Sequence, residues 1–292
     1  MLRTHRTRYT IGMTHALPDL LQIHRCPQLH EATLVLAFAG WMDGGDVSTG
    51  TVRRLVHLLK APTIAEIDPE PFYIFNLPGS MEIATLFRPY VDIVDSVIQH
   101  IDLPTNTFYS HDPANLVLFI GHEPQLRWRT FGECIFGLVR QVGIRRILFV
   151  GAFGGAVPHT REPRLYVTCS DADQLSELAQ YRLRTTQYHG PGSFTTYLMT
   201  QAQSVGVQMT ALVAEIPGYL QGTNPLCIEA ITRRLAKILH LPLDLASLRT
   251  ASTAWELEIS SLIEQNDELA ETVRRLEEAY DNELLELDAD NT

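Results

Sequence analysis

LVLAFAGWMDGGD, residues 34–46, joins a short apolar run to an acidic turn that contains two consecutive glycines. The run 34–39 is continuous, which is typical of a strand that helices cover on both faces of a parallel sheet. Apolar residues at helical spacing follow, and Asp46 or Ser48 could cap that helix. Strand, turn and helix in this order predict an α/β fold, in which ligands bind beyond the carboxyl ends of the strands. Trp41 and Asp43 stand at such an end, where they either line a site or only shape and cap the turn.

Strands and helices alternate along the rest of the chain. Apolar runs bounded by turn residues predict strands at 62–67, 115–120, 146–150 and 207–216, a short aromatic strand at 72–75, and a strand or hairpin arm at 91–101. Helical spacing predicts helices at 129–142, 171–180, 193–204 and 225–239, and helical structure from 243 onward. This alternation predicts a three-layer α/β/α sandwich with a largely parallel sheet and a C-terminal helical segment.

The charge of the chain is unevenly distributed. The net charge of the 292 residues is −11, and residues 255–292 hold 13 acidic and 2 basic residues, so the preceding body is neutral. A neutral body without a basic face argues against nucleic acid as a partner. No apolar run approaches the roughly 18 residues of a membrane span. The four scattered cysteines and the absence of a secretory signal predict a cytoplasmic protein with reduced thiols.

Four segments are expected from these patterns. Residues 1–19 form a disordered or weakly ordered N-terminal tail, within which Met13 could be the true start. Residues 20–240 form the α/β/α core, 241–280 a helical lid, and 281–292 an acidic tail.

Polar side chains follow several of the predicted strands. In a parallel sheet these turns meet at one edge, which predicts a common pocket for small ligands. The candidate ligand-binding residues are Trp41, Asp43, Glu123, His159, Arg161, Glu215 and Tyr219.

Motifs in three of these turns resemble one known family. GWMDGGD at 40–46, GHEPQLRW at 121–128 and VPHTR at 157–161 are similar in order and spacing to the proteasome assembly chaperone 2 family, in its bacterial branch. The resemblance covers roughly residues 20–278. It implies a core similar to that of purine nucleoside phosphorylases, a helical C-terminal region and a homotrimer. Relatives that dock on proteasomes use a C-terminal hydrophobic-Tyr-any motif, whereas this sequence ends in DADNT.

The chemistry of the candidate residues leaves alternatives open. The glycines at 151–155 form either a tight turn or a phosphate-binding loop, but the sequence lacks the P-loop ending. His159 could be a general base and Arg161 an anion ligand, or both could hold their loop by hydrogen bonds. His122 and Glu123 could form an acid–base pair, although sequence neighbours often point apart. Nothing in the sequence predicts a cofactor or a metal site.

Apolar residues repeat every seven positions near the C-terminus. One row contains Ile259, Asn266, Val273, Tyr280 and Leu287, and the other contains Trp255, Leu262, Leu269 and Leu276. The spacing predicts one long helix over 255–280 that packs its second row on the body as a lid. The alternative is a coiled-coil oligomer with Asn266 in its seam.

Two functions are compatible with these observations. The first is an oligomeric binding or assembly protein, a homotrimer by resemblance, that recognises a protein or small ligand at the strand-end pocket. The second is a hydrolase or a nucleoside-phosphorylase-like transferase that uses the same pocket. No nucleophile, base and orienting group can be assembled from the sequence, which favours the first.

Overall fold

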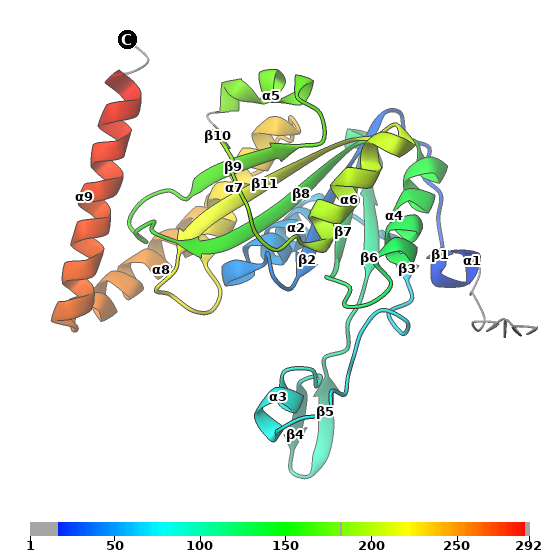
Figure 1. Cartoon of the computed structure of the whole chain (residues 1–292), viewed down its shortest axis with the longest axis horizontal. Helices are drawn as coiled ribbons and strands as arrows, with labels where there is room; N and C mark the ends of the chain where they lie inside the picture. Colours follow the sequence, from blue (N-terminus) through cyan, green and yellow to red (C-terminus); the bar gives the residue numbers. More distant parts are fainter. Residues whose placement is uncertain (1–16, 182, 290–292) are drawn as a thin grey trace, which may run out of the picture.

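The computed structural model describes residues 17–181 and 183–289. The tail predicted at 1–19 therefore lies mostly outside the described residues, and its last residues belong to the short helix α1 (Leu17–Leu20). Figure 1 shows a central twisted sheet with helices on both of its faces, an arm that projects from one side, and two C-terminal helices at one end. The predicted α/β fold is confirmed.

A nine-stranded sheet runs through the described chain in the order β1-β3-β6-β7-β2-β8-β11-β9-β10 (Figure 1). Its four central strands are parallel: β7 (Leu116–His122), β2 (Ala32–Ala39), β8 (Ile144–Gly155) and β11 (Gln208–Pro217). Antiparallel pairing adds β1 (Leu21–Ile23), β3 (Thr63–Ile67), β6 (Thr107–His111) and β9 (Arg164–Cys169), and β10 (Arg184–Thr185) lies parallel to β9. The sheet is thus parallel at its centre and mixed at its edges.

Strand β2 supplies both hydrophobic cores, because successive side chains of a strand point to opposite faces. Leu34, Leu36 and Phe38 enter one core, together with α4 (Trp128–Val142) and α6 (Phe194–Ala202). Val35 and Ala37 enter the other core, together with α2 (Val47–Leu59) and α7 (Pro225–Ile238). The continuous apolar run therefore marks a strand buried on both faces, as predicted.

The remaining helices are short or lie at the ends of the molecule. They are the 3-10 turns η1 (Gly44–Asp46), η2 (Asp112–Ala114), η3 (Ala179–Tyr181) and η4 (Gln203–Val205), the helices α3 (Met81–Thr85) and α5 (Asp173–Leu178), and the C-terminal helices α8 (Ala246–Glu264) and α9 (Asp267–Ala289). Helix α3 and the hairpin of β4 (Val91–Val94) and β5 (Val97–Ile101) form the projecting arm, which we define as residues 76–105 (Figure 1).

Two local expectations about strands are wrong. The segment 72–75 is not a strand; Phe72 is instead a fully buried anchor whose ring packs edge-on against Phe131 at 4.9 Å. The glycines at 151–155 do not form a turn, because β8 continues through them in parallel register with β11 up to Pro217. Gly155 is needed there, since a Cβ atom would overlap the Glu215 side chain.

The C-terminal segment is two helices and not the single helix expected over 255–280. The chain breaks at Gln265, and the Asn266 side chain accepts a hydrogen bond from Leu269 N at 3.1 Å, as an N-cap does. Asn266 therefore starts a helix instead of marking a coiled-coil seam. Leu262, from the row expected to be buried, is 56% exposed, whereas Val273 and Tyr280 of the other row are buried.

We predict that Phe38→Ala destabilises the protein by about 3–5 kcal/mol, because it empties a fully packed aromatic site. The Phe38 ring lies 5.2 Å from Phe119 and 5.5 Å from Phe194, centroid to centroid. Urea unfolding measures the loss. Leu262→Ala is the control and should change the free energy of unfolding by less than about 0.5 kcal/mol. A large loss of stability in this variant would show that Leu262 is buried, as the heptad pattern predicted.

Candidate functional site

The turns that follow the central strands lie at one edge of the sheet and are joined by backbone contacts. Ala152 N donates to Met42 O at 2.7 Å, and Asp43 forms an isolated parallel bridge with Ala152. On the other side of the turn, Asn224 N donates to Gly45 O at 2.8 Å. Gly45 has a positive φ of 62°, and a Cβ atom there would meet the Asn224 side chain at 2.9 Å. The 40–46 turn is therefore wedged between β8 and the start of α7.

Asp43 is the residue that caps α2. Its carboxylate accepts from Thr49 N at 2.9 Å and from the Thr49 hydroxyl at 2.8 Å. The residues expected as caps have other partners: Asp46 Oδ2 accepts from the Thr223 hydroxyl, and the Ser48 hydroxyl donates to Val150 O, both at 2.5 Å. Burial raises the pKa of Asp43 from its ordinary value of 3.8 to about 6. A carboxyl of this kind can exchange a proton near neutral pH, but its oxygens already hold the helix start.

Glu123 connects two backbone segments. One of its carboxylate oxygens accepts from Phe194 N, the first residue of α6, at 2.7 Å, and the other accepts from Trp41 N at 3.3 Å. His122 points away toward Thr105, whose N–H lies 3.4 Å from Nδ1. The two neighbours therefore do not form the acid–base pair considered above.

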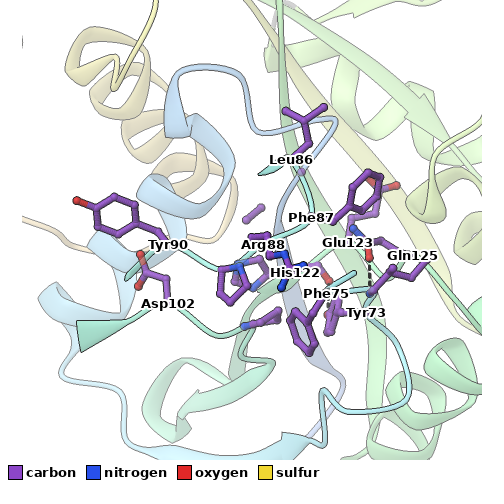
Figure 2. Close-up of a pocket in the computed structure, with 15 residues that line it drawn as sticks. Tyr73, Phe75, Leu86, Phe87, Arg88, Tyr90, Asp102, His122, Glu123 and Gln125 are labelled. Atoms are coloured by element: carbon purple, nitrogen blue, oxygen red, sulfur yellow. Dashed lines mark hydrogen bonds between the residues drawn. The ribbon is translucent and has the colours of Figure 1, made fainter. Parts of the chain in front are cut away.

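A cavity of about 330 Å³ lies between the body and the arm (Figure 2). Aromatic side chains form much of its wall, and Arg88, Asp102, His122 and Glu123 add charged or titratable groups. Burial lowers the pKa of His122. Among the described residues that line this cavity, Glu123 is the one member of the predicted set of seven.

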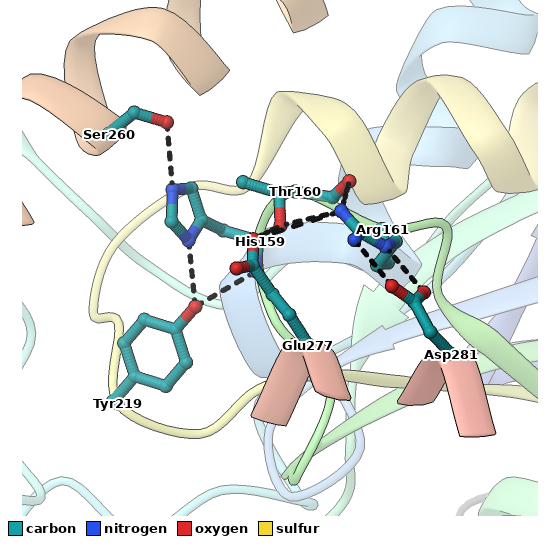
Figure 3. Close-up of polar contacts among 7 residues, drawn as sticks. All are labelled: His159, Thr160, Arg161, Tyr219, Ser260, Glu277 and Asp281. Carbon is teal, nitrogen blue, oxygen red and sulfur yellow. Dashed lines mark hydrogen bonds and ion pairs between the residues drawn. The ribbon is translucent and has the colours of Figure 1, made fainter. Parts of the chain in front are cut away.

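His159 lies at the centre of a second polar group, shown in Figure 3. The Tyr219 oxygen lies 2.8 Å from both His159 N and Nδ1, and Ser260 Oγ of α8 lies 3.0 Å from Nε2. Because the Tyr219 oxygen accepts from the backbone N–H, its own hydrogen can be donated to Nδ1, which leaves Nε2–H to donate to Ser260. Burial lowers the pKa of His159 and raises the pKa of Tyr219 to about 12. Both side chains are thus held in their neutral forms.

The residues after His159 contact helix α9 (Figure 3). Arg161 forms two hydrogen bonds with Asp281, from Nε at 2.9 Å and from NH2 at 2.8 Å. Thr160 donates to Glu277, which also lies 3.7 Å from Arg161 NH1. An arginine fork that meets a carboxylate in this way fixes orientation as well as charge. We call the contacts of residues 159–161 with α8 and α9 the latch.

Glu215 belongs to a buried ion network beside the latch. It accepts from Ala156 N at 2.8 Å and from the Tyr166 hydroxyl at 3.1 Å, and Arg164 NH1 lies 3.4 Å away. Arg164 also reaches Glu283 of α9 at 2.6 Å, and its guanidinium lies 4.8 Å from the centre of the Tyr280 ring. This network is a second attachment of α9 to the sheet.

The seven predicted residues therefore fall into two neighbourhoods on one edge of the sheet. Trp41, Asp43 and Glu123 surround the 40–46 turn, and His159, Arg161, Glu215 and Tyr219 lie against α8 and α9. Sequence reasoning missed the partners Arg164, Ser260, Glu277, Asp281 and Glu283. The charge distribution contained a partial signal for them, because an acidic C-terminal segment is attracted to cations on the body such as Arg161 and Arg164.

The described residues, 17–181 and 183–289, contain neither a metal site nor a membrane-spanning helix. No group of three or more His, Cys, Asp or Glu side chains is arranged there to hold a metal ion. Within the same ranges, none of the helices has the length and apolar character needed to cross a membrane.

A model of the PAC2 family matches residues 37–263, which is most of the chain and includes all the turns described above. The chain belongs to the PAC2 family. The resemblance noted in its sequence motifs is confirmed. No curated protein matches this PAC2 chain.

Several solved structures are similar to it. A proteasome-assembly chaperone homologue from Mycobacterium tuberculosis is 29% identical with a TM-score of 0.70, over 82% of this chain and 99% of that one. A PAC2 family protein from Streptomyces avermitilis is 27% identical with a TM-score of 0.68, over 83% and 99% of the two chains. A Mycobacterium tuberculosis protein of unknown function shares the fold, with 22% identity and a TM-score of 0.82 over 98% and 95%. The likeness to this third protein extends over nearly the whole chain.

We predict that Asp43→Asn changes the pH dependence of stability. The folded state holds the Asp43 proton more tightly than the unfolded state, so this group contributes stability below about pH 4 and loses it as the pH rises through about 6. Asparagine keeps an acceptor for Thr49 N and does not ionise. Between pH 4 and pH 7 the variant should therefore gain roughly 2–3 kcal/mol relative to the wild type in urea unfolding. A difference that stays constant over this range would contradict the burial of the charge.

We also predict that two neighbouring arginines differ in their effect on stability. Arg164→Gln removes the cation beside Glu215, whose side chain is 9% exposed, and should cost about 3–5 kcal/mol. Arg161→Gln breaks a pair whose side chains are 33% and 49% exposed, and should cost at most about 1 kcal/mol. Urea unfolding of both variants tests this, and equal losses would show that the latch and the buried network are one unit.

Proposed function

We propose that this PAC2 protein is an oligomeric binding and assembly protein, a homotrimer that presents the carboxyl-end edge of its sheet to a protein partner. The proposal rests on the way the fold uses its candidate catalytic groups. Asp43 caps a helix, Glu123 accepts two backbone N–H groups, and both ring nitrogens of His159 have partners. A general base must be free to reach a substrate proton, and these groups are committed to holding turns and helices in place.

Exposed apolar side chains at the same edge support a binding role. Trp41 is 59% exposed and Phe153 is 38% exposed, and their segments are joined by the hydrogen bond from Ala152 N to Met42 O. Tryptophan supplies a large contact area with little loss of conformational entropy, and it is enriched among the residues that dominate binding energy. An assembly protein needs such a surface beside a rigid sheet.

The similar structure from Mycobacterium tuberculosis is that of a proteasome-assembly chaperone homologue. We extend that role to this chain and propose that its partner is a subunit of a larger ring assembly. We place the contact on the Trp41 surface, because this part of the carboxyl-end edge exposes aromatic side chains.

We predict that light scattering at micromolar concentration gives three times the 32.9 kDa mass of the chain. Purified proteasome α-subunits, added as the probe, should bind with an affinity that Trp41→Ala lowers by about tenfold or more, as expected for an exposed aromatic anchor. Leu175→Ala, at an exposed position on α5, is the matched control and should leave binding unchanged. A mass of one chain, or equal binding by wild type and Trp41→Ala, would overturn the proposal.

The alternative is a nucleoside-phosphorylase-like transferase or a hydrolase in the cavity beside Glu123. Purified protein incubated with nucleosides and phosphate should release no free base above the background of a Glu123→Gln variant. Release that depends on Glu123 would favour the enzyme over the binding protein.

A further inference from the structure

The arm carries a concentration of exposed apolar side chains. Every residue of β4 and β5 is exposed. Twenty large apolar side chains are exposed in the described chain, and eleven of them lie between residues 81 and 103: Met81, Ile83, Leu86, Tyr90, Val91, Ile93, Val94, Val97, Ile98, Ile101 and Leu103. Exposed apolar surface of this density marks an interaction site in a native protein.

The arm also gives its hairpin little support, because helix α3 has only five residues and neither α3 nor the two strands bury a side chain. Two strands alone are marginally stable in water, and stable small sheets pack on a helix or add a third strand. Strands β4 and β5 pair with each other in a separate sheet, and Figure 1 shows the arm held away from the main sheet. A partner that covers the hairpin would supply the missing packing.

The charge of the arm argues against a contact between two arms. Residues 81–103 contain four acidic residues, Glu82, Asp92, Asp95 and Asp102, and one basic residue, Arg88. Two arms placed face to face would bring like charges together, which is destabilising across paired strands. The arm instead requires a partner surface that is apolar with basic residues around it.

A basic groove that includes some apolar side chains lies on the body, beside helix α2. A cavity of about 380 Å³ lies between α2 and the strands β6 and β7, lined by Arg53, Val56, His57, Thr105, Tyr109 and Ile120. Arg54 on α2 and Lys60 directly after the helix are also exposed. Among the ion pairs of the described residues, none involves Arg53, Arg54, His57 or Lys60. We call this cavity and its rim the α2 groove.

We propose that the arm of one copy of this chain docks in the α2 groove of a second copy. The inference rests on the proposed homo-oligomer and identifies its interface. The 23 residues between Met81 and Leu103 match the roughly 20–30 residues that one partner contributes to a standard interface. The acidic arm and the basic groove are complementary in charge, and Val56, Tyr109 and Ile120 give the groove partly buried apolar side chains that the arm can contact.

The position of the groove allows a closed assembly. Thr105, at the root of the arm, lines the groove of the same chain, so each copy holds a donor arm next to an acceptor groove. A contact between two different surfaces generates a ring when the rotation between copies closes. Three copies related in this way use every arm and every groove once.

The first test places charge in the apolar part of the arm. Ile93 and Ile98 face each other across the hairpin and are 59% and 67% exposed. In Ile93→Glu and Ile98→Glu, light scattering at micromolar concentration should give monomers, while circular dichroism and the melting temperature confirm a folded body. Leu262→Glu, at a position that is 56% exposed on α8, is the matched control and should remain trimeric.

The second test exchanges the charges of the two surfaces. Glu82→Lys with Asp92→Lys, or Arg53→Glu with Arg54→Glu, should each weaken assembly by at least tenfold at low salt. The four substitutions combined in one chain should restore assembly to within about threefold of the wild type. Restoration would assign the arm to the groove, because no other pair of surfaces is reversed.

The outcomes separate this inference from the function on which it rests. A monomeric wild-type protein would overturn the proposed oligomer and this contact with it. A trimer that survives Ile93→Glu and Ile98→Glu would overturn the arm contact and leave the oligomer intact. Monomeric arm variants without restoration by the fourfold charge exchange would overturn the groove as the acceptor.

Discussion

The burial of β2 on both faces is the constraint on which the rest of the structure depends. Seven of its eight residues are buried, and Ala39 is partly buried. The strand therefore needs a helical layer on each side. Parallel neighbours satisfy its backbone groups, since β7 and β8 pair with it on its two edges. The helices that cover a parallel sheet are also the connections between its strands. This single strand therefore sets the layers and gathers the ends of the central strands at one edge.

The same arrangement explains why polar residues at that edge hold the turns together. A turn between a buried strand and a covering helix contains backbone groups that water reaches poorly, and each needs a partner. The Asp43 carboxylate accepts a hydrogen bond from a backbone N–H group at the start of α2. The Glu123 carboxylate accepts from backbone N–H groups at the start of α6 and in the turn at Trp41. By their type and position these residues resemble an acid–base set. The need for hydrogen-bond acceptors in these turns is enough to explain why they are there.

Local patterns were sufficient to predict the central strands and covering helices, because burial imposes a period of 2 or 3.6 on the sequence. They failed for β6 and β9, whose side chains alternate between partial and full burial and whose runs include polar residues such as Thr107, Ser110 and Thr168. At the candidate site, the residue types were identified but their partners were not. The contacts of Arg161 and Arg164 with α9 span more than a hundred residues, and no local pattern records such a distance.

The sequence distance across the latch has a consequence for the folding of the chain during its synthesis. Arg161 and its partner Asp281 are 120 residues apart. At about 5–20 residues per second, a ribosome needs on the order of ten seconds to make the second after the first. In that interval all the strands of the sheet have been made, while the guanidinium groups that α9 will cover still face water. The nascent body must therefore be held by its two apolar cores and its own hydrogen bonds, and the acidic helix joins a sheet that is already complete.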